Sequence, residues 1–267
     1  MQTVRAFCEA ILRGGALADK LRPPGALDDD EPRPPLVIDA PSRAASLAMN
    51  DGSERLPKLS QLTDPAARIS CLQRFAHHEL QAVELFAWAL LAFPAMPSGL
   101  RRGLLITLVE EQSHLQLYLD RLAAHGATLE GAALSDYFWQ HAHALAASPD
   151  GPLAFLATMG LTFEQANLDF TLHFRDGFRT AGDEATALVL QRVHDDEVGH
   201  VKLATTWMAR LKREGETDID TYRRAVPFPL SAARAKGKRF DKKARERAGL
   251  SKPFIEFVER ARPYETR

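Results

Sequence analysis

Two Glu-x-x-His pairs are the residues of this 267-residue sequence whose types and spacing suggest metal chemistry. Glu111 and His114 form the first pair, within EEQSH, and Glu197 and His200 form the second, within HDDEVGH. Residues three apart lie on the same face of an α-helix, so each pair can present a carboxylate and an imidazole to one metal ion. A single pair would be weak support, because a solvated helix can carry one by chance.

Both pairs interrupt the apolar stripe of their own helical pattern. Counting by threes and fours, the first stripe is Leu104, Leu108, Glu111, Leu115, Tyr118 and Leu122, and the second is Leu190, Val193, Glu197, His200, Ala204, Trp207 and Leu211. A carboxylate in the core is unfavourable by several kcal/mol unless it is paired or bound to a metal. The pattern therefore favours metal binding over simple packing.

Two further helical patterns each carry one acid at the middle of the apolar stripe, Glu79 and Glu164. Glu164 follows Glu79 by 85 residues, and the second Glu-x-x-His pair follows the first by 86. These matching intervals indicate two related helical hairpins. Within each hairpin the turn falls near the middle of the interval between the acids, so antiparallel helices bring the two carboxylates to the same level.

Four long helices are predicted to carry these residues. Their expected ranges are Asp64 to Phe93, Ser98 to His125, Asp150 to Gly182 and Asp183 to Gly215. The first has an aspartate cap followed by proline at the first helical position, which is a strong helix start. Residues 127–149, with a short helix in SDYFWQHAHALAA, form the one long connection.

This order of short, long and short connections predicts an all-α fold, a four-helix bundle with one long crossover between its second and third helices. Three parts are expected along the chain. Residues 1–62 form an N-terminal arm with a short helix and an otherwise irregular course, residues 63–215 form the bundle, and residues 216–267 form a basic extension that packs on it.

Composition limits the class of protein and its location. The formal net charge is −1, so the whole chain has no general attraction to nucleic acid or to membranes. The two cysteines are far apart and have no metal or redox spacing, as is typical of a reducing compartment. The N-terminal residues lack a secretion signal, and no apolar run is long enough to span a bilayer. We therefore expect a cytoplasmic protein.

Four carboxylates and two imidazoles are the ligand set of the ferritin-like di-iron and di-manganese proteins. Over about residues 64 to 214 the chain resembles this di-metal carboxylate superfamily. The segments HHELQAVEL, LTFEQANLDF and HDDEVGHV are similar to a bacterial ferritin-like family known as domain of unknown function 455. The similarity continues into PFPLSAARAKGKRF in the tail.

The resemblance implies a role for each predicted ligand. Glu111 and Glu197 would bridge two metal ions, and Glu79 and Glu164 would be terminal ligands. His114 and His200 would each bind one ion. The expected cofactor is a pair of iron ions, with manganese or a mixed iron and manganese pair as the alternative.

Five further residues are candidates to support these ligands. Glu84 and Asp169 are equivalent under the 85-residue interval, and ion pairing elsewhere is an equally good interpretation of both. Glu110 and Asp196 immediately precede the bridging acids and could hydrogen-bond the histidines, although a solvated position is the default. His77 is next to the helix face of Glu79, where a packing role is favoured.

The leading functional hypothesis is a non-haem di-iron oxidoreductase that activates O2 or peroxide to oxidise or hydroxylate a small organic molecule. An electron donor is a possible further partner. Two small residues near Glu164, Gly160 and Ala157, could leave room for the substrate. The alternatives are an iron-handling or peroxide-scavenging protein, a structural metal bundle and a tRNA-modifying hydroxylase. RNA is disfavoured because the basic run from Arg234 to Arg247 has only Phe240 for stacking. The oligomeric state stays open.

Overall fold

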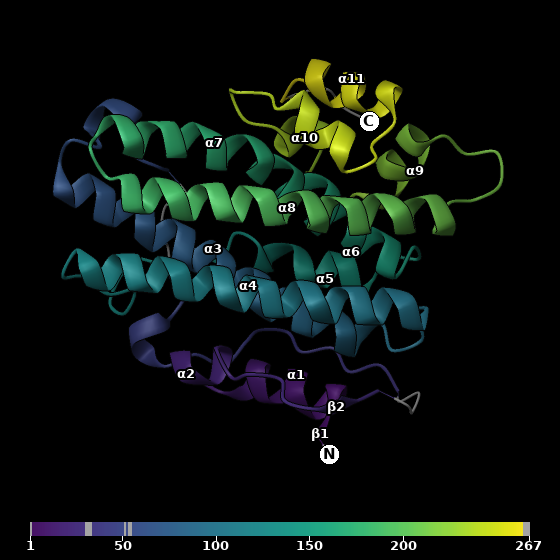
Figure 1. Cartoon of the computed structure of the whole chain (residues 1–267). Helices are drawn as coiled ribbons and strands as arrows, with labels where there is room; N and C mark the ends of the chain where they lie inside the picture. The colour runs from purple at the N-terminus through teal and green to yellow at the C-terminus, as the bar shows by residue number, and fades with distance from the viewer. Residues whose placement is uncertain (1, 30–33, 51, 53–54, 264–267) are drawn as a thin grey trace. The chain divides into compact units, whose positions relative to one another are not determined.

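The computed structural model describes residues 2–29, 34–50, 52 and 55–263, and the regular secondary structure of this part of the chain is almost entirely helical (Figure 1). It divides into two compact units, unit 1 at Met1–Ala146 and unit 2 at Ala147–Arg267. Among the described residues, strands are limited to β1 at Gln2–Thr3 and β2 at Leu27–Asp28, which pair in parallel within unit 1. The prediction of an all-α chain is confirmed.

Unit 1 is built on a hairpin of two long helices, α3 at Pro65–Ala92 and α4 at Ser98–Ala124. The side chain of Asp64 accepts a hydrogen bond from the Ala66 amide, and Pro65 occupies the first helical turn. A proline there loses no hydrogen bond, because the first amides of a helix have no partner inside it. Both helices match their predicted ranges to within one residue.

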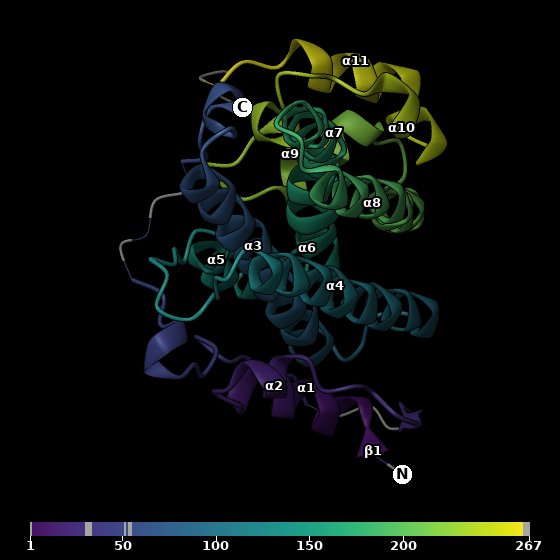
Figure 2. The same cartoon turned by 60° about the vertical axis from the view of Figure 1, so that its left-hand side comes forward.

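The N-terminal arm packs on this hairpin. It contains α1 at Val4–Arg13, α2 at Leu17–Lys20 and the short 3₁₀ turns η1 at Ala45–Leu47 and η2 at Leu59–Gln61. Helix α1 contacts α3, and Figure 2 shows α1 and α2 running beside the hairpin. Residues 30–33, 51, 53 and 54 of the predicted irregular arm lie outside the described residues.

Unit 1 ends in the predicted crossover. The short helix expected there is present as a 3₁₀ turn, η3 at Trp139–His141, followed by α5 at Ala142–Ala146. An isolated bridge between Met49 and Leu134 ties the crossover to the arm.

Unit 2 contains the second hairpin, and its first limb is not the uniform helix that was predicted. It consists of α6 at Pro152–Thr158, the π-helical segment η4 at Met159–Glu164 and α7 at Gln165–Thr180. The second limb is α8 at Glu184–Leu211, capped by the side chain of Asp183. The predicted end of this helix at Gly215 was too late, because Lys212 is already extended.

The C-terminal residues form a small helical layer on the second hairpin (Figure 1). Its elements are α9 at Asp218–Ala225, the 3₁₀ turn η5 at Ala232–Ala235, α10 at Lys242–Arg247 and α11 at Lys252–Arg260. Of these, α10 contacts both α7 and α8, and η5 contacts the π-helical segment η4. Residues 216–263 of the tail are therefore part of unit 2.

Among the helices of the described residues, none has both the length and the apolar composition that a membrane span requires.

Candidate metal centre

Unit 1 brings three predicted ligands together, one from α3 and two from α4. One ligand atom from each of Glu79, Glu111 and His114 lies within 4.8 Å of the others. The three side chains are at most 4% exposed. His114 Nδ1 lies 3.6 Å from Glu111 Oε2, as expected for side chains one helical turn apart. We call these three residues the first triplet.

Unit 2 brings together the equivalent three residues. Glu164 ends the π-helical segment η4, and Glu197 and His200 lie on α8. One ligand atom from each again lies within 4.8 Å of the others, and none of the three is more than 4% exposed. His200 Nδ1 is 3.0 Å from Glu197 Oε2. These residues are the second triplet.

The composition of each triplet fits a divalent metal ion. Carboxylate oxygens and imidazole nitrogens are the donors that iron and manganese accept in proteins, whereas a thiolate site would favour zinc or copper. The free cysteines of the described chain, Cys8 and Cys71, belong to neither triplet. A buried pair of carboxylates is also more stable with a cation between them than as two neighbouring anions.

The π-helical segment controls where Glu164 is placed. A π-helix is wider than an α-helix and occurs mostly as single turns, frequently at functional sites. Gly160 lies in η4, and a Cβ atom built there would be only 2.3 Å from the Cβ of Ala204 on α8. The absence of a side chain at Gly160 therefore lets the segment lie directly against α8. The space predicted for substrate beside Gly160 is taken up by this contact.

Replacing Gly160 with alanine should destabilise unit 2. We expect the free energy of unfolding to fall by about 1–3 kcal/mol, the usual effect of overpacking, and metal occupancy to fall because Glu164 moves with η4. Urea unfolding followed by circular dichroism measures the first effect. Gly199→Ala is the control, because Gly199 lies on α8 with open space around it and alanine favours a helix. Equal stability of the two variants would contradict the assigned role of Gly160.

Two polar contacts near the second triplet were not predicted. Asn167 Nδ2 donates to Glu197 Oε1 at 3.0 Å, and Thr162 Oγ1 lies 2.7 Å from the hydroxyl of Tyr222. Asn167 follows Glu164 by three residues, so its position on the ligand face could have identified it. Tyr222 comes from α9 and carried no such signal. Burial raises the pKa of Tyr222 above its ordinary value, so its phenol stays protonated.

Glu84 is the centre of a buried ion-pair cluster in unit 1. Arg43 binds it through two hydrogen bonds of 3.1 and 2.7 Å, and Lys20 Nζ lies 3.0 Å from its Oε1. The indole of Trp139 donates to Oε2 at 3.0 Å. These are the contacts expected if Glu84 pairs with cations. The cluster ties the N-terminal arm and the crossover to α3.

Asp169 has the same kind of environment in unit 2. Arg245 binds its two oxygens at 2.7 and 2.9 Å, and the amides of Gly237 and Asp241 donate to it at 2.8 and 2.7 Å. Arg245 is fully buried and lies over the ring of Phe240. The basic run is therefore not only surface, because Arg245 anchors the tail to α7.

The remaining candidates have ordinary partners. Asp196 accepts a hydrogen bond of 2.6 Å from Arg192, and Glu110 is half-buried on α4. His77 Nε2 lies 2.9 Å from Arg43 Nη1, and since a guanidinium can only donate, this nitrogen is the acceptor. His77 thus supports the ion-pair cluster around Glu84, in line with the favoured packing role.

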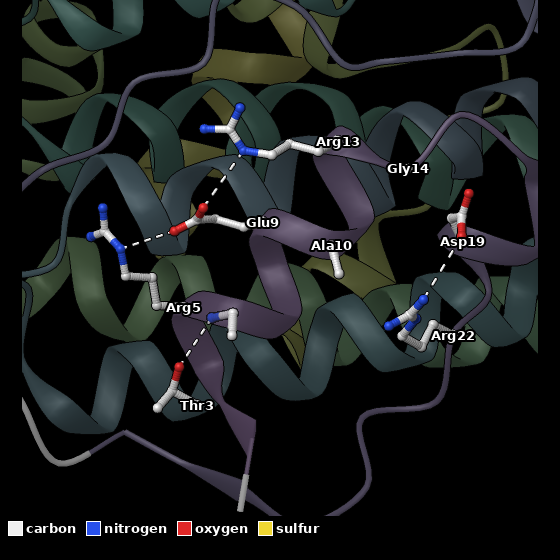
Figure 3. Close-up of a pocket in the computed structure, with 9 residues that line it drawn as sticks. Thr3, Arg5, Glu9, Ala10, Arg13, Gly14, Asp19 and Arg22 are labelled. Atoms are coloured by element: carbon white, nitrogen blue, oxygen red, sulfur yellow. Dashed lines mark hydrogen bonds and ion pairs between the residues drawn. The ribbon is translucent and has the colours of Figure 1, made fainter.

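A separate shallow groove of about 620 Å³ lies on the arm of unit 1 (Figure 3). Arg5 and Arg13 flank Glu9 on one side of the groove, and Arg22 lies next to Asp19 on the other side. Each guanidinium there has an acid nearby, so its charge is largely compensated. The groove contains no member of either triplet.

Comparison with known proteins gives a family but no named relative. No curated protein matches the chain, and no solved structure does. One family model matches residues 2–256, a range that contains both triplets, the arm and the tail up to α11. The chain therefore belongs to the family described as Protein of unknown function (DUF455).

Proposed function

We propose that the two triplets join in a ferritin-like four-helix bundle to bind two iron ions, and that the protein is a di-iron oxidase or hydroxylase of a small organic substrate. The observation that carries the proposal is the repetition of one buried ligand group. Each hairpin has two glutamates and one histidine with donor atoms within 4.8 Å of one another. The sequence intervals of 85 and 86 residues make the two groups equivalent.

Charge and ligand number support two ions rather than one. Six donors with four carboxylates match the ligand set of di-metal carboxylate bundles. Four carboxylates also balance the charge of two divalent cations, which removes the penalty of burying either set alone.

The proposed role of each ligand follows from its place. Glu111 and Glu197 would hold both ions, Glu79 and Glu164 would each hold one, and His114 and His200 would each supply one nitrogen to one ion. Bound iron would supply one-electron and oxygen chemistry, and the protein would position it and exclude water. Near the second triplet, Asn167 orients Glu197 and the bond between Thr162 and Tyr222 ties α9 to η4.

The metal content and its reaction with O2 test the proposal. Protein purified from its own host should contain close to two iron ions per chain by plasma mass spectrometry. Metal-free protein loaded with Fe²⁺ without air and then exposed to O2 should develop absorption in the near ultraviolet and visible range. His114→Ala should lose or greatly slow this change, because one ion then lacks its nitrogen ligand.

Other outcomes would replace the proposal. Manganese in the purified protein, with no reaction of the iron-loaded form toward O2 or peroxide, would contradict the oxidase and indicate a di-manganese or structural site. Rapid consumption of peroxide without oxidation of any added organic compound would indicate a scavenging function with the same ligands.

A further inference from the structure

Arg245 of the C-terminal tail holds the residue that directly follows the predicted ligand Glu164. Its Nη2 donates to the backbone oxygen of Gln165 at 3.2 Å. In the amide orientation that satisfies both neighbours of Gln165, its Oε1 accepts from Arg245 Nε at 3.0 Å. The same guanidinium binds both oxygens of Asp169, one turn further along α7. Arg245, Gln165 and Asp169 are all fully buried, so one side chain of the tail contacts the junction between η4 and α7 in the interior of unit 2.

The side chain of Gln165 makes a bond to the π-helical segment that its backbone does not. The backbone N–H of Gln165 donates to Gly160 O, five residues back, and to Thr162 O, but not to Leu161 O, which an α-helix would use. The side-chain Nε2 of Gln165 donates to Leu161 O instead, at 2.8 Å. Buried carbonyls are nearly always paired, so this bond favours the wider turn over a regular α-helix. Arg245 orients the amide for this bond, because it occupies the other end of the amide.

The direction of the Glu164 side chain depends on this turn. Helices α6 and α7 flank η4, and all three elements contact α8. A π-helical turn contains one more residue than an α-helical turn, so a return to α-helical pairing would rotate the flanking helices relative to each other by about 100°. Contacts that hold the turn therefore also hold the direction of the Glu164 carboxylate.

We propose that Arg245 is a positioning residue for the metal ligand Glu164, and that through it the C-terminal tail sets how tightly the protein binds the ion that Glu164 would hold. Arg245 acts through Gln165 and belongs to neither triplet. The inference rests on the proposed metal-binding function, because the direction of Glu164 matters to metal affinity only if Glu164 is a ligand.

Arg245→Lys separates positioning from anchoring. Lysine keeps a positive charge beside Asp169, but its single nitrogen cannot replace the three guanidinium nitrogens that also hold Gln165. The full-length metal-free protein is titrated with Mn²⁺, and electron paramagnetic resonance measures the free ion. We expect an unchanged helix content by circular dichroism and a Kd that rises by about tenfold for one ion per chain, the usual effect of losing an outer contact.

Gln165→Met tests the second link of the same route. Methionine has a similar length but cannot donate to Leu161 O, and it leaves the ion pair between Arg245 and Asp169 in place. We expect a similar rise in the Kd for Mn²⁺. Because both changes interrupt one route, the double variant should bind Mn²⁺ about as weakly as either single variant, whereas independent losses would multiply. Each single variant is informative by itself when it is folded.

Thr221→Val is the control within the tail. Thr221 is fully buried on α9, and among the described residues its hydroxyl bonds only Glu216 and Thr217. Its variant disturbs the tail without removing a hydrogen bond to η4, so the Kd for Mn²⁺ should stay unchanged.

Three results would overturn the inference. They are unchanged Mn²⁺ binding in a folded Arg245→Lys or Gln165→Met variant, an equal loss of affinity in Thr221→Val, and multiplied losses in the double variant. Failure of the proposed function is distinguishable from these results, because the unmodified protein would then bind no Mn²⁺, and both proposals would be overturned together.

Discussion

Glu111→Ala and Glu197→Ala should each lose most of both metal ions. In the proposed centre each of these carboxylates would hold both ions, so removing either one should weaken two metal positions at once. Removal of a terminal ligand such as Glu79 should affect mainly the ion that it contacts. The metal content measured after equilibrium dialysis should therefore fall from two ions per chain toward none in the bridging variants.

Asp120→Ala is the matched control for this experiment. Asp120 lies on α4 like Glu111, but it is exposed and bonds only Gln116 among the described contacts. Its variant should retain both ions. Full occupancy in both Glu111→Ala and Glu197→Ala would contradict the bridging assignment, and loss of one ion in each would show that every triplet holds its ion separately.

The helices of the hairpins were predictable because their ends are specified locally. Asp64 followed by Pro65 starts α3, Ser98 begins α4, and Asp183 caps α8. These signals need only the neighbouring residues. The grouping of the three side chains in each triplet was predictable for a related reason, since acids on an apolar stripe at matching intervals depend on helix periodicity alone.

Features that depend on contacts between distant segments were not predictable in the same way. The apolar pattern across the π-helical turn at Met159–Glu164 is still that of a continuous helix, so the sequence did not indicate the turn. Gly160 in this turn lies against Ala204, which belongs to the other limb of the hairpin. The bond from Asn167 to Glu197 likewise joins two helices. Arg245 looked like one charge among many, because its partner Asp169 is 76 residues away.

Glu84→Gln should lower the free energy of unfolding by about 3–5 kcal/mol, the usual effect of breaking a buried ion pair. The variant leaves Lys20 and Arg43 buried without their carboxylate. Urea unfolding of the metal-free protein measures the loss. Glu9→Gln is the control, because Glu9 pairs with Arg5 at a partly exposed position and should contribute under about 1 kcal/mol.

The difference in the free energy of unfolding between Glu84→Gln and the unmodified protein should become smaller as the pH rises. Burial already lowers the pKa of Lys20 below its ordinary 10.5, so the unfolded chain binds more protons than the folded one between the two values. Stability therefore rises with pH in that window, and the window is wider in Glu84→Gln, because the carboxylate of Glu84 raises the pKa of Lys20 and the variant lacks it. Arg43 is buried without its carboxylate in the variant at every pH, so part of the loss should persist. A deficit that widens with pH would contradict this account of the cluster.

Glu79→Gln should differ from Glu84→Gln in both stability and metal loading, although the two residues are only five apart on α3. Glutamine at position 79 removes one negative charge from a buried group of acids, so the metal-free protein should be as stable as the unmodified one or slightly more stable. Metal loading should fall, because a neutral amide is a weaker ligand than a carboxylate. In Glu84→Gln the folded fraction should still load metal, since the contacts of Glu84 are with Lys20, Arg43 and Trp139. The reverse pattern, with metal loading lost only in Glu84→Gln, would place the ligand of α3 at Glu84 and exclude Glu79.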